Sequence, residues 1–381
     1  MSQAGAQVLL DGAAWASALL LLAGLVLLRR HWARLPALPE DPLLPAEPPS
    51  VCLCIPVRDE AAELGAALDS WLAQDYPALR ILGVDDGSTD GSSEILRARE
   101  AARPDRLRVV RNDHLPPGWL GKNHALDLAS RQPEAQAADW LLFADGDVQA
   151  SPGLLRRAVA FALAQPTDIL ALIPGVDVEG PAERMVLPLA ASAFQVLVPP
   201  HQVPNPRHPA FCGVGGFTLV RRRAYDVVGG HAGAPLEAID DMMLARRVKQ
   251  VGFVNRVAQG GPELHLRMYH GLGELVRAMR KNAAAVPAWW ILPFALPPAV
   301  LVVLSPLWMP FAGHAGLAAW LWLLVPALAG DVQQRMTGRP MDLFWALWPL
   351  NGLILAAGTG WALWDRLRGI NHWRGRDVRL S

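Results

Sequence analysis

Two aspartates follow an apolar run at a spacing that could bind a cation. The run WLLFA is followed directly by Asp145, Gly146 and Asp147. Carboxylates at positions i and i+2, with a glycine between them that permits a sharp bend, can face one hard cation through oxygen ligands. Such a cation usually also binds substrate phosphates. The alternative is a polar turn that closes a strand, because Asp and Gly are favoured in turns.

Two further acidic groups lie earlier in the chain, Asp59-Glu60 in IPVRDE and Asp85-Asp86 in VDDGSTDGS. The second pair could accept hydrogen bonds from a base or from a ribose hydroxyl. The Ser/Thr/Gly turn after it supplies backbone N–H donors, and a helix N-terminus favours anions. The composition of this segment therefore suits a nucleotide.

The elements that would position these residues alternate along the chain. The apolar run Val51–Val57 is typical of a buried parallel strand, and apolar spacing predicts a helix over Glu60–Gln74. Further strands (RILGVDD, LRVVRN, DWLLFADGD) alternate with helices (SSEILRAREAA, GKNHALDLASR). Strands that alternate with helices indicate a mostly parallel sheet, and ligands bind beyond the carboxyl ends of its strands. All three acidic groups fall at such ends, which predicts one shared site.

Composition excludes several classes of protein. Hydrophobic residues make up 52% of the 381 residues and charged residues 18%, against about 25% charged in an average soluble domain. Disorder, collagen and coiled coil are excluded. The balance of 35 Lys+Arg with 35 Asp+Glu argues against a nucleic-acid partner. Cys52 and Cys54 are expected to be small buried hydrophobes, and the ten histidines lack the spacing of a zinc site.

The N-terminus carries a predicted membrane anchor. Val8–Leu28 contains one charged residue, Asp11, and has about the 20 residues that a spanning helix needs. Arg29, Arg30 and Arg34 follow it, the reverse of the order in a cleaved signal peptide. Because Lys and Arg stay on the cytoplasmic side, the anchor should end in the cytoplasm. We predict an anchor over residues 1–35 and a proline-rich linker over residues 36–49.

The C-terminal part, residues 286–381, is predicted to contain membrane segments and a basic tail. Candidate spans are Trp289–Met309, Ala315–Ala329 and Leu343–Trp364; a buried helical core is the alternative. Three spans would place the C-terminus outside, whereas its arginines favour the cytoplasm. One of the first two stretches could therefore be interfacial or re-entrant. Met185–Pro199 is either a helix in the plane of the membrane or a core helix.

The motifs IPVRDE, VDDGSTDGS and FADGDV, in this order and spacing, resemble glycosyltransferase family 2, the inverting enzymes of GT-A fold. The resemblance continues through CGVGGFTLVRRR, AIDDMMLARRVK and RAMRKN and covers about residues 50–285. PPGWLGKNHAL and HWRGR are similar to membrane-bound members associated with hopanoid and carotenoid glycosylation, and ceramide glucosyltransferase is more distantly alike. The resemblance implies an α/β, Rossmann-like, mostly parallel mixed sheet with flanking helices, and transmembrane helices at both ends.

The resemblance also implies roles for individual residues. Asp241, the second residue of the pair with Asp240, would be the general base, and Asp145 with Asp147 would hold Mg²⁺ or Mn²⁺. Arg277 and Arg280 occupy a motif near the diphosphate and the acceptor. The expected nucleotide-sugar-binding residues are Pro56, Asp59, Glu60, Asp85, Asp86, Lys122 and Asp145. From the residues alone, Lys122 is as well explained as a helix cap.

The expected function is inverting transfer of a sugar from a nucleotide diphosphate, UDP-linked, to a lipid acceptor at the cytoplasmic face of the cell membrane. Polyprenyl phosphate, hopanoid and carotenoid-like lipids are the candidate acceptors. Lys281 stands where the family has tryptophan, which weakens the case for a processive polymer synthase. The alternatives are a non-catalytic membrane sensor or scaffold that binds nucleotide sugars, and a lipid transporter. The sequence does not determine the oligomeric state.

Overall fold

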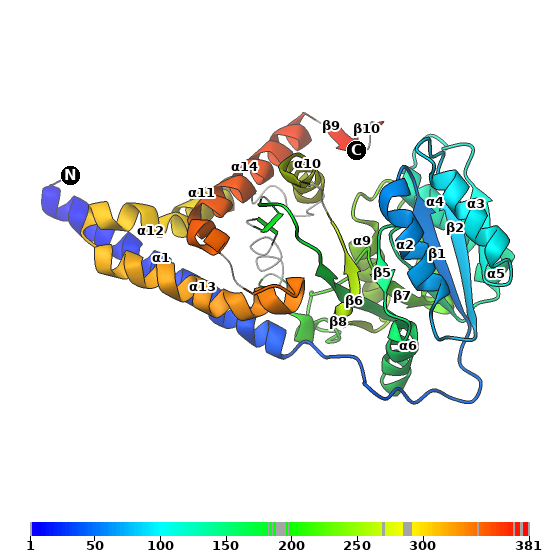
Figure 1. The fold of residues 1–381 in the computed structure, drawn as a ribbon. Coiled ribbons are helices and arrows are strands. Elements are labelled where there is room, and N and C mark those ends of the chain that lie inside the picture. The colour runs from blue at the N-terminus through cyan, green and yellow to red at the C-terminus, as the bar shows by residue number, and fades with distance from the viewer. Residues whose placement is uncertain are drawn as a thin grey trace. The chain divides into compact units, whose positions relative to one another are not determined.

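The computed structural model describes residues 2–181, 183–184, 186–187, 196, 198–268, 271–284, 292–340, 343–368, 370–373 and 376–379 (Figure 1). They form two compact units. The sheet unit comprises residues 35–177 and 198–267, and the helical unit comprises residues 1–34, 178–197 and 268–381.

The sheet unit is built on one eight-stranded mixed sheet with the order β3-β2-β1-β4-β7-β6-β8-β5. Its strands are β1 (Val51–Val57), β2 (Leu79–Asp85), β3 (Leu107–Arg111), β4 (Trp140–Phe143), β5 (Gln149–Ala150), β6 (Ile169–Val176), β7 (Thr218–Arg221) and β8 (Asn255–Leu266). The first four strands pair in parallel, as does β6 with β8, whereas β7 runs antiparallel to β4 and β6. The α/β fold class predicted from the sequence is confirmed.

Helices cover both faces of this sheet (Figure 1). The helices of the sheet unit are α2 (Ala61–Leu72), α3 (Ser92–Ala102), α4 (Gly121–Ser130), α5 (Pro133–Gln136), α6 (Leu154–Ala164), α8 (Arg222–Val227) and α9 (Asp240–Gln250). Successive strand side chains point to opposite faces. Leu53 of β1 therefore packs with α2, α3 and α6, and Cys52 and Cys54 with α4, α8 and α9. Both cysteines are fully buried and unpaired, as predicted.

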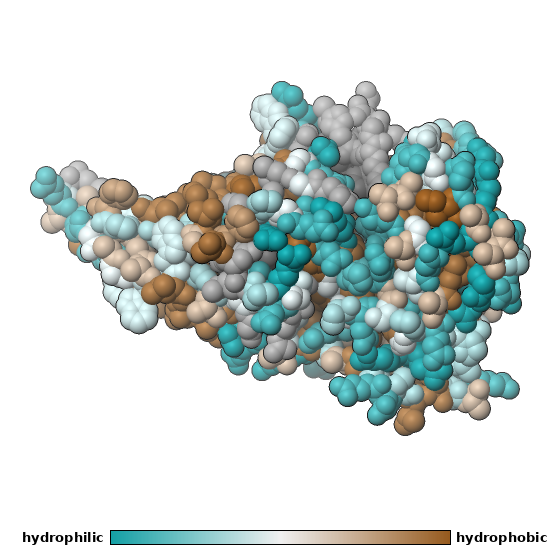
Figure 2. Space-filling view, in the orientation of Figure 1, coloured by the Kyte–Doolittle hydropathy of each residue, from teal (hydrophilic) through white to brown (hydrophobic). Residues whose placement is uncertain are grey.

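The helical unit contains α1 (Gln3–Ala33), α10 (Gly271–Ala284), α11 (Leu292–Val303), α12 (Ser305–Trp308), α13 (Ala315–Thr337), α14 (Trp348–Leu367) and the hairpin β9 (Ile370–Trp373) and β10 (Arg376–Arg379). Small residues of α1, Ala14 and Ala18, pack against Leu321 of α13. Asp11 of α1 lies 3.0 Å from His314 Nε2 and accepts a hydrogen bond from Gln7 at 2.8 Å. Figure 2 shows apolar residues gathered over these helices.

Among the described residues, α1 is long and apolar enough to cross a membrane. A second candidate span consists of two helical segments that meet at 52°, Pro293–Val303 and Ser305–Ala312. It is long enough to cross a membrane only if the two segments form one broken span. This bend falls in the proline-broken stretch for which the sequence left a re-entrant arrangement open, and Pro297 and Pro298 lie inside α11. The apolar part of α13, Ala315–Gly330, is shorter. The segment Met185–Pro199 lies largely outside the described residues.

Candidate functional site

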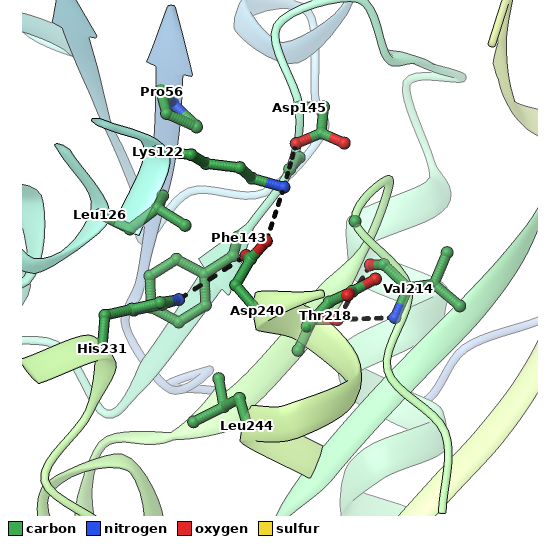
Figure 3. A pocket seen from close by; sticks show the side chains of 13 residues that line it. Pro56, Lys122, Leu126, Phe143, Asp145, Val214, Thr218, His231, Asp240 and Leu244 are labelled. Atoms are coloured by element: carbon green, nitrogen blue, oxygen red, sulfur yellow. Dashed lines mark hydrogen bonds and ion pairs between the residues drawn. The ribbon is translucent and has the colours of Figure 1, made fainter. Parts of the chain in front are cut away.

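A pocket in the sheet unit lies where β1 and β4 end and where α4 and α9 begin (Figure 3). The lining residues are Pro56, Lys122, Leu126, Phe143, Ala144, Asp145, Val214, Gly215, Thr218, His231, Asp240, Asp241 and Leu244. The pocket therefore combines an apolar wall with one ammonium and three carboxylates. Its position beyond the strand ends is the one that the alternation of strands and helices predicted.

Lys122, the second residue of α4, bridges two carboxylates of the pocket. Its Nζ lies 2.7 Å from Asp145 Oδ1 and 3.2 Å from Asp240 Oδ1 (Figure 3). Burial disfavours the charged ammonium, but Asp145, Asp240 and Asp241 outweigh it and hold the pKa of Lys122 well above its usual range. The side chain thus pairs with acids across the pocket instead of only capping its own helix.

Asp240 and Asp241 form the first turn of α9, where a helix favours negative charge. Asp241 Oδ1 accepts the backbone N–H of Met242 at 2.8 Å. Burial, followed by the neighbouring charge of Asp240, raises the pKa of Asp241 despite the opposing effect of Lys122. A carboxylate whose pKa is raised toward the working pH is better suited to accept a proton than an ordinary exposed aspartate.

Glycines let the chain approach these acids closely. The Gly215 carbonyl accepts the N–H of Asp145 at 3.1 Å, and a Cβ on Gly215 would stand 2.7 Å from Asp145 Oδ2. A Cβ on Gly213 would overlap the backbone carbonyl of Asp241. The segment GVGGFT therefore packs against the start of α9 and against the Asp-x-Asp turn, and side chains at these two positions would separate them.

Gly213→Ala is expected to lower the free energy of unfolding by about 1–3 kcal/mol, because the added methyl group meets backbone that cannot move aside. Gly65→Ala is the matched control. Gly65 lies within α2, and a Cβ there meets only the end of the Arg99 side chain, at 3.7 Å, so alanine should leave stability unchanged or raise it. Thermal unfolding of both variants checks this. Equal melting temperatures would contradict the close approach at Gly213.

The residues expected to bind the nucleotide lie in a tightly bonded loop. Asp85 Oδ1 accepts the N–H of Ser88 at 2.9 Å, and the Ser93 hydroxyl donates to the other oxygen. Asp86 Oδ1 accepts from Asn112 at 2.5 Å. Burial alone would raise the pKa of Asp85, but the bonds from Ser93 and Ser88 outweigh it and lower that pKa. Both acids therefore hold this loop in place.

Asp59 adopts a left-handed backbone, with φ +51°. Its Oδ1 accepts the N–H of Thr89 at 2.7 Å, and its side chain is 42% exposed. Glu60 contacts the Asp-x-Asp turn, since a Cβ on Gly146 would overlap its carboxylate. Asp59 thus remains open to a ligand, while Glu60 supports the turn.

The structure gathers five of the expected residues at one pocket: Pro56, Lys122, Asp145, Asp240 and Asp241. Asp147 is not among the residues that line it. Arg277 and Arg280 lie on α10 of the helical unit, and their roles stay predictions. His231, which lines the pocket and lies 3.9 Å from Asp240, was missed. The only signal for it in the sequence is the loop GGHAG shortly before the acidic pair.

The acids of the pocket suit a hard divalent cation, although no cluster of three or more His, Cys, Asp or Glu side chains with metal-binding geometry occurs in the described part of the chain. Asp145 lines the pocket and already faces one cationic atom, Lys122 Nζ at 2.7 Å, and Asp147 follows it two residues later. Mg²⁺ is commonly held by one or two carboxylates together with substrate phosphates. The residues present therefore fit a metal that arrives with a diphosphate.

Residues 52–229 match the family model for glycosyl transferase family 2. The matched residues make up a little under half of the 381 residues. The chain is 31% identical over 114 residues to glycosyltransferase AglE of Haloferax volcanii, which is 29% of this chain and 35% of that protein. It is 34% identical over 121 residues to the β-monoglucosyldiacylglycerol synthase of Synechocystis sp., which is 31% of this chain and 24% of that protein. The matches thus span about a quarter to a third of these relatives.

A solved structure shares the fold over nearly the whole chain. It is the mannosyltransferase PcManGT from Pyrobaculum calidifontis in complex with GDP-Man and Mn²⁺, with a TM-score of 0.57 and 19% sequence identity. The alignment covers 94% of this chain and 99% of that one. At this identity the likeness concerns the fold, and it agrees with the GT-A architecture implied by the motifs.

Proposed function

We propose that this chain is a membrane-anchored inverting glycosyltransferase that transfers a sugar from a nucleotide diphosphate, UDP-linked, to a lipid acceptor at the cytoplasmic face of the cell membrane. The observation that carries the proposal is the pocket at the strand ends of the family 2 domain. There, an ammonium bridges two acids beside Asp241, a carboxylate whose pKa is raised.

The chemistry follows from this charge arrangement. Asp241 takes the proton from the acceptor hydroxyl while the oxygen of that hydroxyl attacks the anomeric carbon of the sugar. The bond from that carbon to the diphosphate breaks, and Lys122 stabilises the departing negative charge. A Mg²⁺ or Mn²⁺ ion held by Asp145 and Asp147 would supply further positive charge at the leaving diphosphate. A single carboxylate on the acceptor side gives one displacement, and hence inversion.

The lipid acceptor is inferred from the helical unit. α1 exposes large apolar side chains such as Trp15, Leu19 and Leu20, and its length and hydropathy suit a bilayer. The arginines after its apolar stretch favour a catalytic domain in the cytoplasm. The name of the Synechocystis relative includes diacylglycerol, a lipid. An enzyme anchored in this way is suited to an acceptor that stays in the membrane, such as a polyprenyl phosphate, a hopanoid or a carotenoid-like lipid.

Donor binding can be tested with the full chain purified in detergent, by thermal-shift titration with UDP, GDP and their sugars, with and without Mn²⁺. A ligand at a hundred times its Kd adds about 2.7 kcal/mol to stability. We expect a Mn²⁺-dependent increase in melting temperature that is largest for the uridine nucleotides.

The matched variants are Asp147→Ala and Asp105→Ala. Asp147→Ala should lose the metal-dependent part of the increase. Asp105→Ala, which removes an exposed acid paired only locally with Arg103, should keep it. No increase with any nucleotide, in protein shown to be folded, would refute the proposed function. An increase confined to GDP compounds would refute the uridine donor alone.

A further inference from the structure

His231 lies at the pocket with its ring directed toward Asp240 (Figure 3). It is 2% exposed. Its Nδ1 lies 2.9 Å from the Tyr225 hydroxyl, and its Nε2 lies 3.9 Å from Asp240 Oδ2. Its ring also packs edge-on against Phe143, with centroids 4.8 Å apart. The imidazole therefore has one orientation, with a nitrogen toward each partner.

The His231 ring is neutral at physiological pH. Burial lowers the pKa of His231 to about 4, and Lys122 and Arg247 act in the same direction, against the attraction of Asp240. A neutral imidazole has one N–H donor and one acceptor nitrogen. The position of this hydrogen decides whether Nε2 presents an N–H donor or a lone pair to Asp240.

The surroundings select the form with hydrogen on Nε2. A lone pair on Nε2 would point at the Asp240 carboxylate and be repelled, whereas an N–H there is attracted. The Tyr225 hydroxyl accepts the backbone N–H of His231 at 3.1 Å, and its own hydrogen can be donated to Nδ1.

We infer that His231 is a positioning residue of the proposed glycosyltransferase site: its Nε2–H faces one oxygen of Asp240 while Lys122 holds the other. The inference rests on the proposed function. At 3.9 Å the N–H attracts the carboxylate without a full hydrogen bond, and such contacts often tighten when substrate binds. With both oxygens restrained, the Asp240 carboxylate keeps one orientation, and its neighbour Asp241 is left to accept the proton.

The loop before His231 is built to hold this pair of rings. Gly230 has φ +52°, and a Cβ there would overlap the Tyr225 ring. Arg247 donates to the carbonyls of Val228 at 3.0 Å and Gly230 at 2.8 Å. Gly230 and Arg247 thus fix the backbone conformation just before His231, and this conformation keeps the Tyr225 and His231 side chains in contact.

Four variants test the inference. His231→Phe removes the dipole and keeps a ring, His231→Gln restores an N–H donor at a similar reach, and Tyr225→Phe removes the group that donates to Nδ1. Tyr76→Phe is the matched control: Tyr76 is also fully buried and donates to the Pro49 carbonyl at 2.6 Å, but does not line the pocket. The measurements are kcat, the Kd for the donor nucleotide, and melting temperature.

We expect kcat to fall at least about 10-fold in His231→Phe, the range seen when partners of functional groups are removed, and less in Tyr225→Phe, with Kd unchanged in both. His231→Gln should recover part of the loss. The double variant that combines His231→Phe with Tyr225→Phe should be no slower than His231→Phe alone, because the two residues act through one contact. Tyr76→Phe should lose stability without losing kcat. A wild-type kcat in His231→Phe, or losses in the two single variants that add in the double variant, would overturn the inference.

A second readout does not depend on turnover. In protein labelled with ¹⁵N-histidine, the His231 ring signals, identified by their loss in His231→Gln, should show a protonated Nε2 and an unprotonated Nδ1. The reverse pattern, or a charged ring at neutral pH, refutes the inference whatever the activity. If the expected pattern is present but wild-type protein transfers no sugar, the proposed function fails and the His231 role in catalysis fails with it, while the His231–Asp240 contact stands.

Discussion

Asp241→Asn is expected to lower the turnover of sugar transfer by about 10²- to 10⁴-fold and to leave nucleotide affinity unchanged. The range is the usual contribution of a positioned general base. Asparagine has nearly the same shape and can still accept the Met242 N–H through its carbonyl oxygen, but it cannot take a proton. Steady-state kinetics with a lipid acceptor, alongside nucleotide titration, checks both parts.

The same variant should not be less stable than wild type. Because the pKa of Asp241 is raised in the folded protein, the folded state holds this proton more tightly than the unfolded state. The protonated Asp241 therefore stabilises the folded state. This contribution is fully present below about pH 3.8 and is lost as the pH rises through the raised pKa. At neutral pH the charge opposes folding, and asparagine removes it. For the same reason, the acidic limb of kcat/KM in wild type should lie above the pKa of an ordinary aspartate.

Asp105→Asn is the control, since Asp105 is exposed and lies outside the pocket. It should behave as wild type in turnover and in nucleotide binding. Full turnover in Asp241→Asn would show that another group is the base. Nucleotide binding without turnover in wild type, for every acceptor tried, would instead favour the non-catalytic sensor or scaffold.

The first half of the sheet could be predicted from the sequence because its signals are local. β1 has the predicted bounds, Val51–Val57, and α2 covers Ala61–Leu72 within the predicted Glu60–Gln74. The second half could not. β7 lies between β4 and β6, and β8 pairs with β6. These strands are far apart in the chain, and the periodicity of apolar residues along one strand does not specify its partner strand.

The acids of the pocket were found because strand ends meet at one edge of a sheet. What each acid contacts was not predictable. The carboxylates of Asp85 and Asp86 accept bonds from Ser88, Ser93 and Asn112, and the contact of both acids with a nucleotide stays a prediction. The role of His231 could not be predicted from the sequence, because its contacts depend on the conformation of a glycine loop and the spacing of histidines reports only on metal sites. Local composition therefore predicted which acids line the pocket, but not the hydrogen-bond partners of these acids.

Lys122→Met is expected to destabilise the protein and to make its stability depend on divalent cations. The substitution keeps the length of the side chain but leaves Asp145, Asp240 and Asp241 facing one another without the ammonium. Removing one partner of a buried pair costs about 3–5 kcal/mol, and about 2 kcal/mol is expected here because 34% of the Asp145 side chain is exposed to solvent. Because Lys122 lowers the pKa of Asp241, that pKa should rise further in the variant. The loss of stability should therefore shrink as the pH falls toward 4 and grow as it rises.

Mn²⁺ separates this electrostatic effect from a simple packing defect. A cation that binds Asp145 can replace the missing ammonium, so Mn²⁺ without nucleotide should raise the melting temperature of Lys122→Met more than that of wild type. Lys249→Met is the matched control, because Lys249 donates to the carbonyl of Val203 at 2.7 Å and lies outside the pocket. It should lose stability but respond to Mn²⁺ no more than wild type does. If Lys122→Met and wild type responded equally to Mn²⁺, the carboxylates around Lys122 would not form a cation site. If only the variant responded, Lys122 would be the internal cation that holds the acids together until metal and diphosphate arrive.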